Sequence, residues 1–196
     1  MANLIIIAGM PATGKTTVSK ALQKYFDYPI VEKDLIKEEL FDTLGFENYQ
    51  QKRNLDHASN AALLYILEEE LRAGRSLMVV NNFDQKSAER LNGIVRHYKP
   101  RCLSIVLHGD EEVLYRRYVD RDNRHLRHLG HIVQDHYPLH DGDSGDYTMT
   151  REEFNEKFVK RGMDSVSLPG ERLDIDATDF TSININSIVD FIKERI

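Results

Sequence analysis

The sequence predicts an α/β fold in which a parallel sheet of five strands has helices on both of its faces. Short apolar runs alternate along the chain with segments whose apolar residues recur at helical spacing. The first run, residues 4–8, is apolar at every position, which is typical of a strand buried on both faces. Strands that alternate with helices build a parallel sheet covered from both sides. With 196 residues, the chain 1–196 has the length of a single domain.

The predicted elements keep this alternation along the whole chain. Strands are predicted over residues 4–8, 29–32, 77–80, 103–107 and 173–175. Helices are predicted over residues 16–26, 34–44, 49–73, 87–98 and 185–192, with further helices after Asp110 and Thr150. Gly45 and Gly74 end two of the helices, because glycine readily adopts the left-handed backbone that closes a helix. Asp110 is a predicted N-cap, and Thr150 with Glu153 forms a predicted capping box.

One region interrupts the alternation. Residues 116–127 hold five arginines and two aspartates, a local charge of +3. Residues 132–156 hold seven acids and one arginine, a local charge of −6, with two glycines and a proline among them. We therefore expect an arginine-rich, mobile lid over about residues 120–150, inserted into the one domain rather than forming a second.

Composition excludes several classes of protein. The formal net charge is −6 and the sequence pI is about 5.8, which disfavours bulk binding to nucleic acid, although a small basic groove remains compatible. The single cysteine, Cys102, cannot form an internal disulfide or a cysteine zinc site, and it is expected in the core. No apolar run has the length that spans a bilayer, and residues 4–8 are too short for a signal-peptide core. These observations predict a cytoplasmic protein without a membrane partner.

The strongest motif is Gly9-Met10-Pro11-Ala12-Thr13-Gly14-Lys15-Thr16, which matches the phosphate-binding pattern G-x-x-x-x-G-K-[ST], the P-loop or Walker A motif. It lies between an apolar strand and an amphipathic helix, the context that such a loop requires. Glycines allow a tight turn whose N–H groups point at phosphate oxygens, and the helix that follows adds the positive end of its dipole. The sequence therefore predicts a P-loop NTPase fold that binds a nucleoside triphosphate.

Each position of the motif has an expected role. The residues expected to contact the nucleotide are Gly9, Met10, Pro11, Ala12, Thr13, Gly14, Lys15, Thr16 and Thr17. The Lys15 ammonium reaches the β- and γ-phosphates, the Thr16 hydroxyl is the expected Mg²⁺ ligand, and Thr17 can touch the α-phosphate.

Other features narrow the class of P-loop protein. The chain has no Asn-Lys-x-Asp motif for reading guanine and no Asp-x-x-Gly switch after a strand, which disfavours a GTPase. Its length leaves no room for the helical subdomain of an oligomeric motor. A compact chain with an arginine-rich lid favours a small-molecule or nucleotide kinase, in which the lid excludes water from the transferring phosphoryl group.

Two groups of charged residues fit a kinase. Asp34 and Lys37 follow the second strand, whose carboxyl end lies beside the phosphate loop. Asp34 could accept the proton of an acceptor hydroxyl and Lys37 could hold an anionic acceptor. The alternatives are an N-cap role for Asp34, which is compatible with catalysis, and a solvated helix charge for Lys37.

Arg117 and Arg121, four residues apart, share one face of a helix, and Arg124 and Arg127 extend the series. Such a pair can place one guanidinium over the adenine and one on the transferring phosphoryl. The alternative is a solvated helix face on which these arginines pair with Asp120 and Asp122. Arg127 and Asn82 complete the expected acceptor contacts.

On these motifs the chain resembles the bacterial family of small P-loop kinases often labelled AAA-type predicted kinases, which is related to polynucleotide 5′-kinase, chloramphenicol phosphotransferase and zeta toxin. The matching pieces are GMPATGKTT, EKDLIKEEL, SLMVVNNF, RRYVDR, RHLGH and DIDATDF. The resemblance implies ATP, Mg²⁺, a five-stranded parallel sheet and phosphoryl transfer to a hydroxyl. It implies that Asp34 is the general base, that Lys37 binds the acceptor, and that Arg121, with Arg117 as its companion, meets the γ-phosphate.

The chain departs from that family at Val80, where related chains often carry an acid that helps to hold Mg²⁺. Thr16 and Asp34 could suffice, because Mg²⁺ keeps several waters, and Asn82 and Asp84 could face the acceptor. The departure keeps two alternatives open beside the kinase: a non-catalytic ATP-binding regulator and a toxin-like amino-sugar kinase. The acids of residues 135–146 favour a neutral or cationic small-molecule acceptor. The sequence leaves the oligomeric state open.

Two further groups have less definite roles. Five histidines, His125, His128, His131, His136 and His140, lie close together, but their spacing fits no closed metal site. Hydrogen bonds that position the lid, or contacts to the acceptor, are the expected roles. The turn 176–179 follows the last strand and either borders the adenine or caps the last helix.

Overall fold

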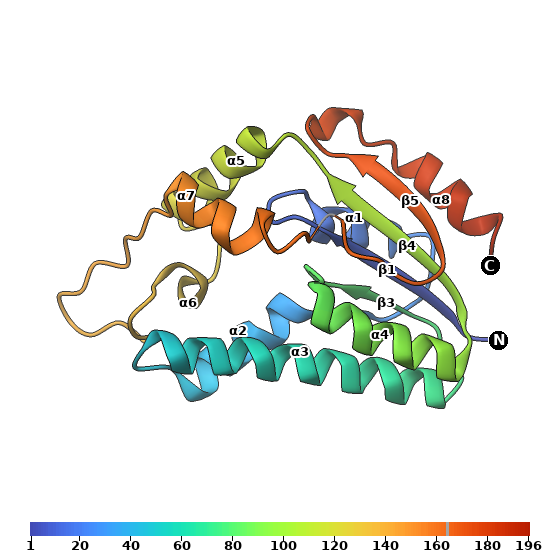
Figure 1. The fold of residues 1–196 in the computed structure, drawn as a ribbon, viewed down its shortest axis with the longest axis horizontal. Helices are drawn as coiled ribbons and strands as arrows, with labels where there is room; N and C mark the ends of the chain where they lie inside the picture. The colour runs from blue at the N-terminus through green and yellow to red at the C-terminus, as the bar shows by residue number, and fades with distance from the viewer. Residues whose placement is uncertain (164) are drawn as a thin grey trace.

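The computed structural model describes residues 1–163 and 165–196 (Figure 1). Its sheet has five parallel strands in the order β2-β3-β1-β4-β5, so β1 lies at the centre. The strands are β1 (Asn3–Gly9), β2 (Ile30–Glu32), β3 (Leu77–Val80), β4 (Arg101–His108) and β5 (Glu171–Asp176). The predicted α/β class and the five-stranded parallel sheet are confirmed, and each predicted strand is present with bounds shifted by a few residues at most.

The helices also follow the predicted order. They are α1 (Lys15–Leu22), α2 (Lys33–Leu44), α3 (Tyr49–Arg72), α4 (Gln85–Tyr98), α5 (Glu111–Asn123), α6 (Leu129–Ile132), α7 (Arg151–Phe154) and α8 (Ile185–Lys193), with a 3₁₀ turn η2 (Phe180–Ser182). The helix predicted over residues 16–26 is shorter than expected. It ends at Leu22, and the turn that follows still carries Phe26 into the same core.

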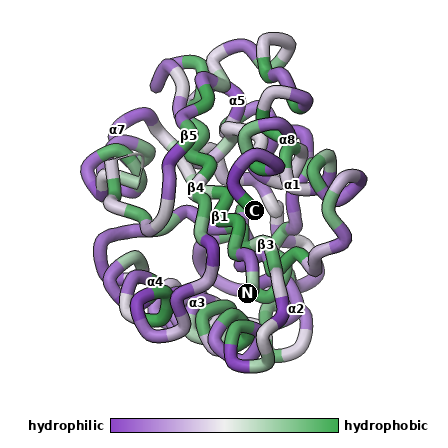
Figure 2. The backbone as a smooth tube through the Cα atoms, turned by 90° about the vertical axis from the view of Figure 1, so that its right-hand side faces the viewer, coloured by the Kyte–Doolittle hydropathy of each residue, from purple (hydrophilic) through white to green (hydrophobic). Residues whose placement is uncertain are grey.

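Two apolar cores lie on opposite faces of the sheet. Leu4 and Ile6 of β1 pack with side chains of α3 and α4, whereas Ile5 and Ile7 pack with α1 and α8. All four side chains are fully buried, because successive residues of a strand point to opposite faces. Figure 2 shows the apolar strands in the interior between helices of mixed hydropathy. Along the described part of the chain, no helix has the length and apolar character needed to cross a membrane.

A third core joins α5 to α7. The predicted capping box of Thr150 and Glu153 is confirmed, since each side chain accepts a hydrogen bond from the backbone N–H of the other. After α7 the chain continues as a π-helical segment, η1 (Asn155–Val159). Phe154 and Phe158 pack there against Tyr118 of α5. The wider π-turn is a local departure from α-helical geometry of the kind often found at functional sites.

Between α5 and α7 the chain is largely irregular, with α6 as its one helix among the described residues 124–150 (Figure 1). Part of this segment is docked on α2 and α3. The buried Lys52 donates hydrogen bonds from Nζ to the carbonyls of His131, at 2.9 Å, and Val133. A Cβ on Gly130 would lie 2.5 Å from the ring of Phe41, so only glycine lets α6 approach α2 this closely.

Candidate active site

The phosphate-loop motif forms the turn from β1 to α1. Gly9 (φ +131°) and Gly14 (φ +85°) both have backbone conformations that favour glycine. A Cβ on Gly9 would lie 1.9 Å from the Leu107 carbonyl oxygen, so this glycine also permits the contact with β4. Gly14 occupies the N-cap position of α1. The loop therefore ends at a helix N-terminus, where unpaired N–H groups attract anions.

Two side chains of the motif close the loop on itself. The Thr13 hydroxyl and the Lys15 ammonium both donate to the Met10 carbonyl, at 2.8 Å and 2.7 Å. Burial, with further contributions from Arg121 and Arg127, lowers the pKa of Lys15 to about 7, although Asp34 and Glu32 act in the opposite direction. Lys15 is thus a poorly solvated cation, which a polyphosphate would stabilise.

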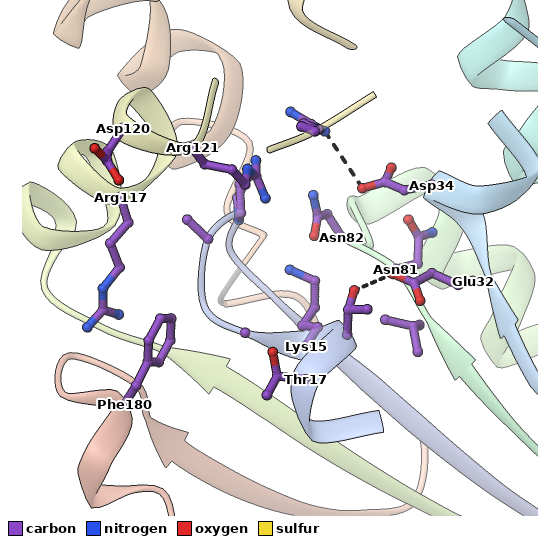
Figure 3. A pocket seen from close by; sticks show the side chains of 16 residues that line it. Lys15, Thr17, Glu32, Asp34, Asn81, Asn82, Arg117, Asp120, Arg121 and Phe180 are labelled. Atoms are coloured by element: carbon purple, nitrogen blue, oxygen red, sulfur yellow. Dashed lines mark hydrogen bonds and ion pairs between the residues drawn. The ribbon is translucent and has the colours of Figure 1, made fainter. Parts of the chain in front are cut away.

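A cavity of about 360 Å³ opens beside this loop (Figure 3). The predicted site residues that line it are Pro11, Ala12, Gly14, Lys15, Thr16, Thr17, Asp34, Asn82, Arg117, Arg121 and Arg127. Four predicted residues do not line it: Gly9, Met10, Thr13 and Lys37. Met10 and Thr13 are buried under the loop. Residues 9–17 and the charged residues that follow β2 and lie on α5 are therefore brought together by the fold.

Glu32, which the sequence analysis missed, also lines the cavity. It ends β2 and accepts a hydrogen bond from the hydroxyl of Thr16. Burial raises the pKa of the Glu32 carboxyl, although the hydrogen bond from Thr16 lowers it. The two oxygens meet at one point beside the phosphate loop, and oxygen donors are the ligands that Mg²⁺ prefers. Thr16 and Glu32 therefore fit a magnesium ion. The sequence could have indicated Glu32 through its position at the end of a predicted strand.

Asp34 lies in the first turn of α2, and the alternative that it is the N-cap of this helix is wrong. The N-cap position belongs to Glu32, whose side chain makes no capping hydrogen bond. The Asp34 carboxylate lies instead 3.7 Å from the Arg127 guanidinium. Burial alone would raise the pKa of Asp34, but the charges of Arg127, Lys33 and other cations outweigh it and lower the pKa to about 2. Asp34 is therefore ionised and faces the cavity (Figure 3).

Arg121 reaches the cavity from α5 as a poorly satisfied cation. Its buried Nε and Nη2 make no hydrogen bond within the described residues, and Nε lies 3.6 Å from an Asp122 oxygen. Burial and the neighbouring Arg127 lower its pKa. The alternative of a solvated arginine face is wrong for Arg121, but it fits Arg124, which is exposed and pairs with Asp120 at 3.3 Å. A guanidinium with two buried nitrogens that make no hydrogen bond suits a transferring phosphoryl group.

Arg117, one helical turn earlier, is held by the turn after β5. Its guanidinium donates to the carbonyls of Ala177 and Thr178. The central carbon of the guanidinium, Cζ, lies 3.7 Å from the ring centre of Phe180. Gly14 lies close to the same ring. Asp179 caps η2 through Thr181, whereas α8 is capped by Asn184, so the alternative that the turn 176–179 caps the last helix is wrong. The turn instead positions Arg117. Arg117 and Phe180 thus form a flat surface at one end of the cavity (Figure 3).

Lys37 lies outside the cavity, although it is not a solvated charge. Its Nζ is 2.8 Å from an oxygen of Asp56 on α3, and Lys33 contacts the same oxygen at 2.6 Å. Burial lowers the pKa of Lys37 despite the charge of Asp56. Lys37 is therefore a largely buried cation behind Asp34.

The residues after β3 divide between structure and site. Val80 is 2% exposed and packs with the core on the α1 side of the sheet. Asn82 lines the cavity. Asp84 does not face it, because it forms the capping box of α4 with Ser87 and an ion pair with Arg161. Of the two residues expected to face the acceptor after Val80, only Asn82 is placed to do so.

Histidines make hydrogen bonds that position the largely irregular segment 124–150 between α5 and α7, here called the excursion. His128 contacts Asp42 at 3.0 Å and His131 contacts Glu38 at 3.1 Å, both on α2. In the described residues, the one group of three or more His, Cys, Asp or Glu side chains whose ligand atoms all lie within 4.8 Å of one another is His136, His140 and Asp143. Cys102 is half-buried, and burial raises the pKa of its thiol to about 12, as for a core residue without reactivity.

Comparisons with known proteins agree with the fold. A family model described as AAA domain matches residues 5–134. A candidate kinase from Chloroflexus aurantiacus has 26% identity and a TM-score of 0.81, over 100% of this chain and 98% of that one. Kti12 from Chaetomium thermophilum, solved in complex with ADP-AlF3, has 17% identity and a TM-score of 0.57, over 98% of each chain.

A gluconokinase from Sinorhizobium meliloti has 16% identity and a TM-score of 0.53, over 96% of this chain and 87% of that one. At this level of identity, the gluconokinase and Kti12 share the fold alone. Among curated proteins, none matches the chain.

Proposed function

We propose, because the chain belongs to the AAA domain family and has the fold of small P-loop kinases, that it transfers the γ-phosphoryl group of ATP to a hydroxyl of a small molecule. One observation carries the proposal. Lys15, Arg121 and Asp34 come from three different elements and line one cavity beside the phosphate loop (Figure 3). Two cations that suit a transferring phosphoryl group therefore face an ionised carboxylate that suits an acceptor hydroxyl.

The phosphate loop binds and orients the nucleotide. Its N–H groups and the Lys15 ammonium hold the polyphosphate, while Arg117 and Phe180 receive the adenine. Thr16 and Glu32 would hold a Mg²⁺ ion, which would supply positive charge to the polyphosphate when bound. Arg121 adds a guanidinium that stabilises the oxygens of the phosphoryl group in transit, because its buried Nε and Nη2 make no hydrogen bond within the described residues.

Asp34 positions the acceptor. As an ionised carboxylate it accepts a hydrogen bond from the acceptor hydroxyl and aims the hydroxyl oxygen at the γ-phosphorus. The new bond forms between that oxygen and the γ-phosphorus while the bond from the γ-phosphorus to the β–γ bridging oxygen breaks. ADP leaves with the electron pair, and the hydroxyl proton passes to Asp34 and then to water. Arg127 holds the Asp34 carboxylate from the other side.

The test is a panel of hydroxyl compounds incubated with γ-labelled ATP. We expect transfer that is abolished in Lys15→Ala and lowered about 10²–10⁴-fold in Asp34→Asn, the range for loss of a general base. Asp190→Asn is the matched control, because Asp190 is an exposed residue of α8 that does not line the cavity. Its rate is expected to stay close to wild type.

The regulator alternative depended on the missing acid at Val80, and the carboxylate of Glu32 removes that motive. Tight ATP binding without transfer to any member of the panel would nevertheless contradict the kinase and support a regulator. Unchanged transfer in Asp34→Asn would contradict the role given to Asp34.

A further inference from the structure

A second cluster of chemically capable side chains lies in the excursion, apart from the candidate active site. His136, His140 and Asp143 bring their ligand atoms within 4.8 Å of one another. One carboxylate oxygen of Asp143 lies 2.7 Å from Nε2 of His136 and 3.9 Å from Nδ1 of His140. The two imidazole rings stack with their centres 4.6 Å apart. Two imidazoles and a carboxylate are a ligand set typical of divalent transition metals.

The distances between these atoms suit a single small ion. Ligand atoms about 2.0–2.1 Å from a tetrahedral Zn²⁺ lie about 3.3 Å from one another. The two distances from the Asp143 oxygen, 2.7 Å and 3.9 Å, fall on either side of this value. Small rotations of the side chains are therefore enough to aim all three groups at one ion. The ion would replace the hydrogen bond between His136 and Asp143.

The backbone holds the three residues near one another. His136 precedes Tyr137, whose N–H and carbonyl form two hydrogen bonds of 2.8 Å with Phe46, at the connection from α2 to α3. His140 and Asp143 belong to one turn, in which the Asp143 N–H donates to the His140 carbonyl at 3.1 Å. The His140 N–H donates in return to the Asp143 carboxylate at 3.0 Å. The turn is formed before an ion binds, which reduces the entropy lost on binding.

A cavity of about 280 Å³ lies against the cluster and leaves room for further ligands of the ion. His136 and Asp143 line it, together with Asp135 and Asp146. Residues 132–150 contain four acids and no lysine or arginine, so the local field attracts a cation. This cavity shares no lining residue with the candidate active site. The three acids that line it therefore give no reason to expect a neutral or cationic acceptor.

We propose that His136, His140 and Asp143 bind a divalent transition-metal ion such as Zn²⁺. Three protein ligands leave a position for water or for a carboxylate of the cavity, so the site is open, whereas the histidine spacing in the sequence fits no closed site. The ion joins His136, which is anchored beside α2 and α3, to the turn 140–143, and so fixes the outer loop of the excursion (Figure 1). Imidazole ligands favour such an ion over Mg²⁺, which prefers oxygen.

Calorimetric titration of the chelator-treated protein with Zn²⁺, in the presence of excess Mg²⁺, tests the proposal. We expect a single ion to bind with a Kd of about 10 μM or tighter. His140→Ala and Asp143→Asn should each weaken binding about 100-fold or more, because even the outer partners of metal ligands are worth about 10–100-fold. His57→Ala is the matched control, since His57 is an exposed histidine of α3, and its affinity should equal that of wild type. Both substituted ligands are exposed, so the variants should fold, and urea unfolding of the metal-free proteins verifies this.

Hydrogen exchange then locates the ion. Zn²⁺ should slow the exchange of amides over residues 136–146 in wild type and in His57→Ala, but not in His140→Ala. Binding weaker than about 10 μM, or affinity that is equal in wild type and the two ligand variants, would overturn the proposal. A loss in His57→Ala as large as that in His140→Ala would overturn it too, because the ion would then bind surface histidines at random. None of these measurements uses catalysis, so their failure leaves the proposed phosphotransferase function unaffected.

Discussion

Glu32 is the register partner of Val80 on the neighbouring strand of the sheet. The resemblance to small kinases places an acid at Val80, and the structure supplies the carboxylate one strand away, where it meets the hydroxyl of Thr16. The carboxyl ends of adjacent parallel strands lie at one edge of the sheet, so an acid on either strand can serve the same point. Loss of the acid at one position is therefore compatible with a complete magnesium site.

Glu32→Gln tests whether Glu32 on β2 takes the role of the acid that is missing at Val80 on β3. The amide keeps the shape of the side chain and removes its charge. We therefore expect the Mg²⁺ concentration needed for ATP binding and phosphoryl transfer to rise about 10–100-fold. Affinity for nucleotide without Mg²⁺ should change little. Titrations of activity and nucleotide binding with Mg²⁺ provide the measurement, and Glu39→Gln, an exposed residue of α2, is the control. Equal Mg²⁺ dependence in the two variants would remove Glu32 from the site.

The sequence predicts much of this fold for clear reasons. Strand β1 is apolar throughout, and Gly9 and Gly14 satisfy a local backbone requirement that the motif records directly. The role of Glu32 was missed because it depends on which strands are neighbours. The strand order β2-β3-β1 cannot be predicted from the residues of any one segment of the sequence.

The pKa of Lys15, lowered to about 7, predicts a pH dependence of nucleotide affinity. A polyphosphate favours the protonated ammonium, so binding is accompanied by proton uptake once the free protein has lost that proton. We expect the affinity for Mg²⁺-ATP to fall as the pH rises from 7.5 to 9, by up to about tenfold per pH unit. Calorimetry in buffers of different ionisation enthalpy measures the proton uptake directly. Lys15→Ala should bind weakly at every pH and without this slope; a slope that persists in Lys15→Ala would assign it to another group.

Phe180 provides a test of the base end of the cavity. Its ring stacks on the Arg117 guanidinium, which two carbonyls hold in place. If the adenine packs on this surface, Phe180→Ala should weaken ATP binding about 3–10-fold, the usual value of one aromatic contact. Binding of inorganic tripolyphosphate, which has no base, should be unchanged, and Phe180→Tyr should resemble wild type. An equal loss for both ligands would place the effect in the phosphate loop.

Gly130 and Gly93 predict opposite effects of the same substitution. A Cβ on Gly130 would lie 2.5 Å from the Phe41 ring, so Gly130→Ala should destabilise the docked excursion by about 1–3 kcal/mol, as overpacking does. Gly93 lies inside α4 with no atom within 4 Å of the Cβ position, and Gly93→Ala should stabilise the protein by about 0.5–1 kcal/mol. Urea unfolding measures both changes, and hydrogen exchange over residues 124–150 localises the first. Unaltered exchange there in Gly130→Ala would contradict the packing argument.

Lys52 predicts how the stability of the fold depends on pH. Its side chain is buried, and the pKa of its ammonium falls from 10.5 to about 6 in the folded protein. Between these two values the unfolded chain holds a proton that the folded chain has released, so the free energy of unfolding rises with pH, by at most about 1.4 kcal/mol per unit. Below pH 6 both states are protonated, and the cost of burying the charge is fully present.

Lys52→Met removes this contribution together with the two hydrogen bonds to the excursion. The stability of wild type minus that of Lys52→Met should therefore increase from pH 7 to pH 9, whatever its sign at pH 7. Other lysines with a lowered pKa, such as Lys157, act in both proteins and largely cancel in the difference. Urea unfolding at pH 7, 8 and 9 supplies the measurement. Parallel curves for the two proteins would show that Lys52 keeps its proton in the folded state, which would require an acidic or solvated environment in place of the two carbonyls.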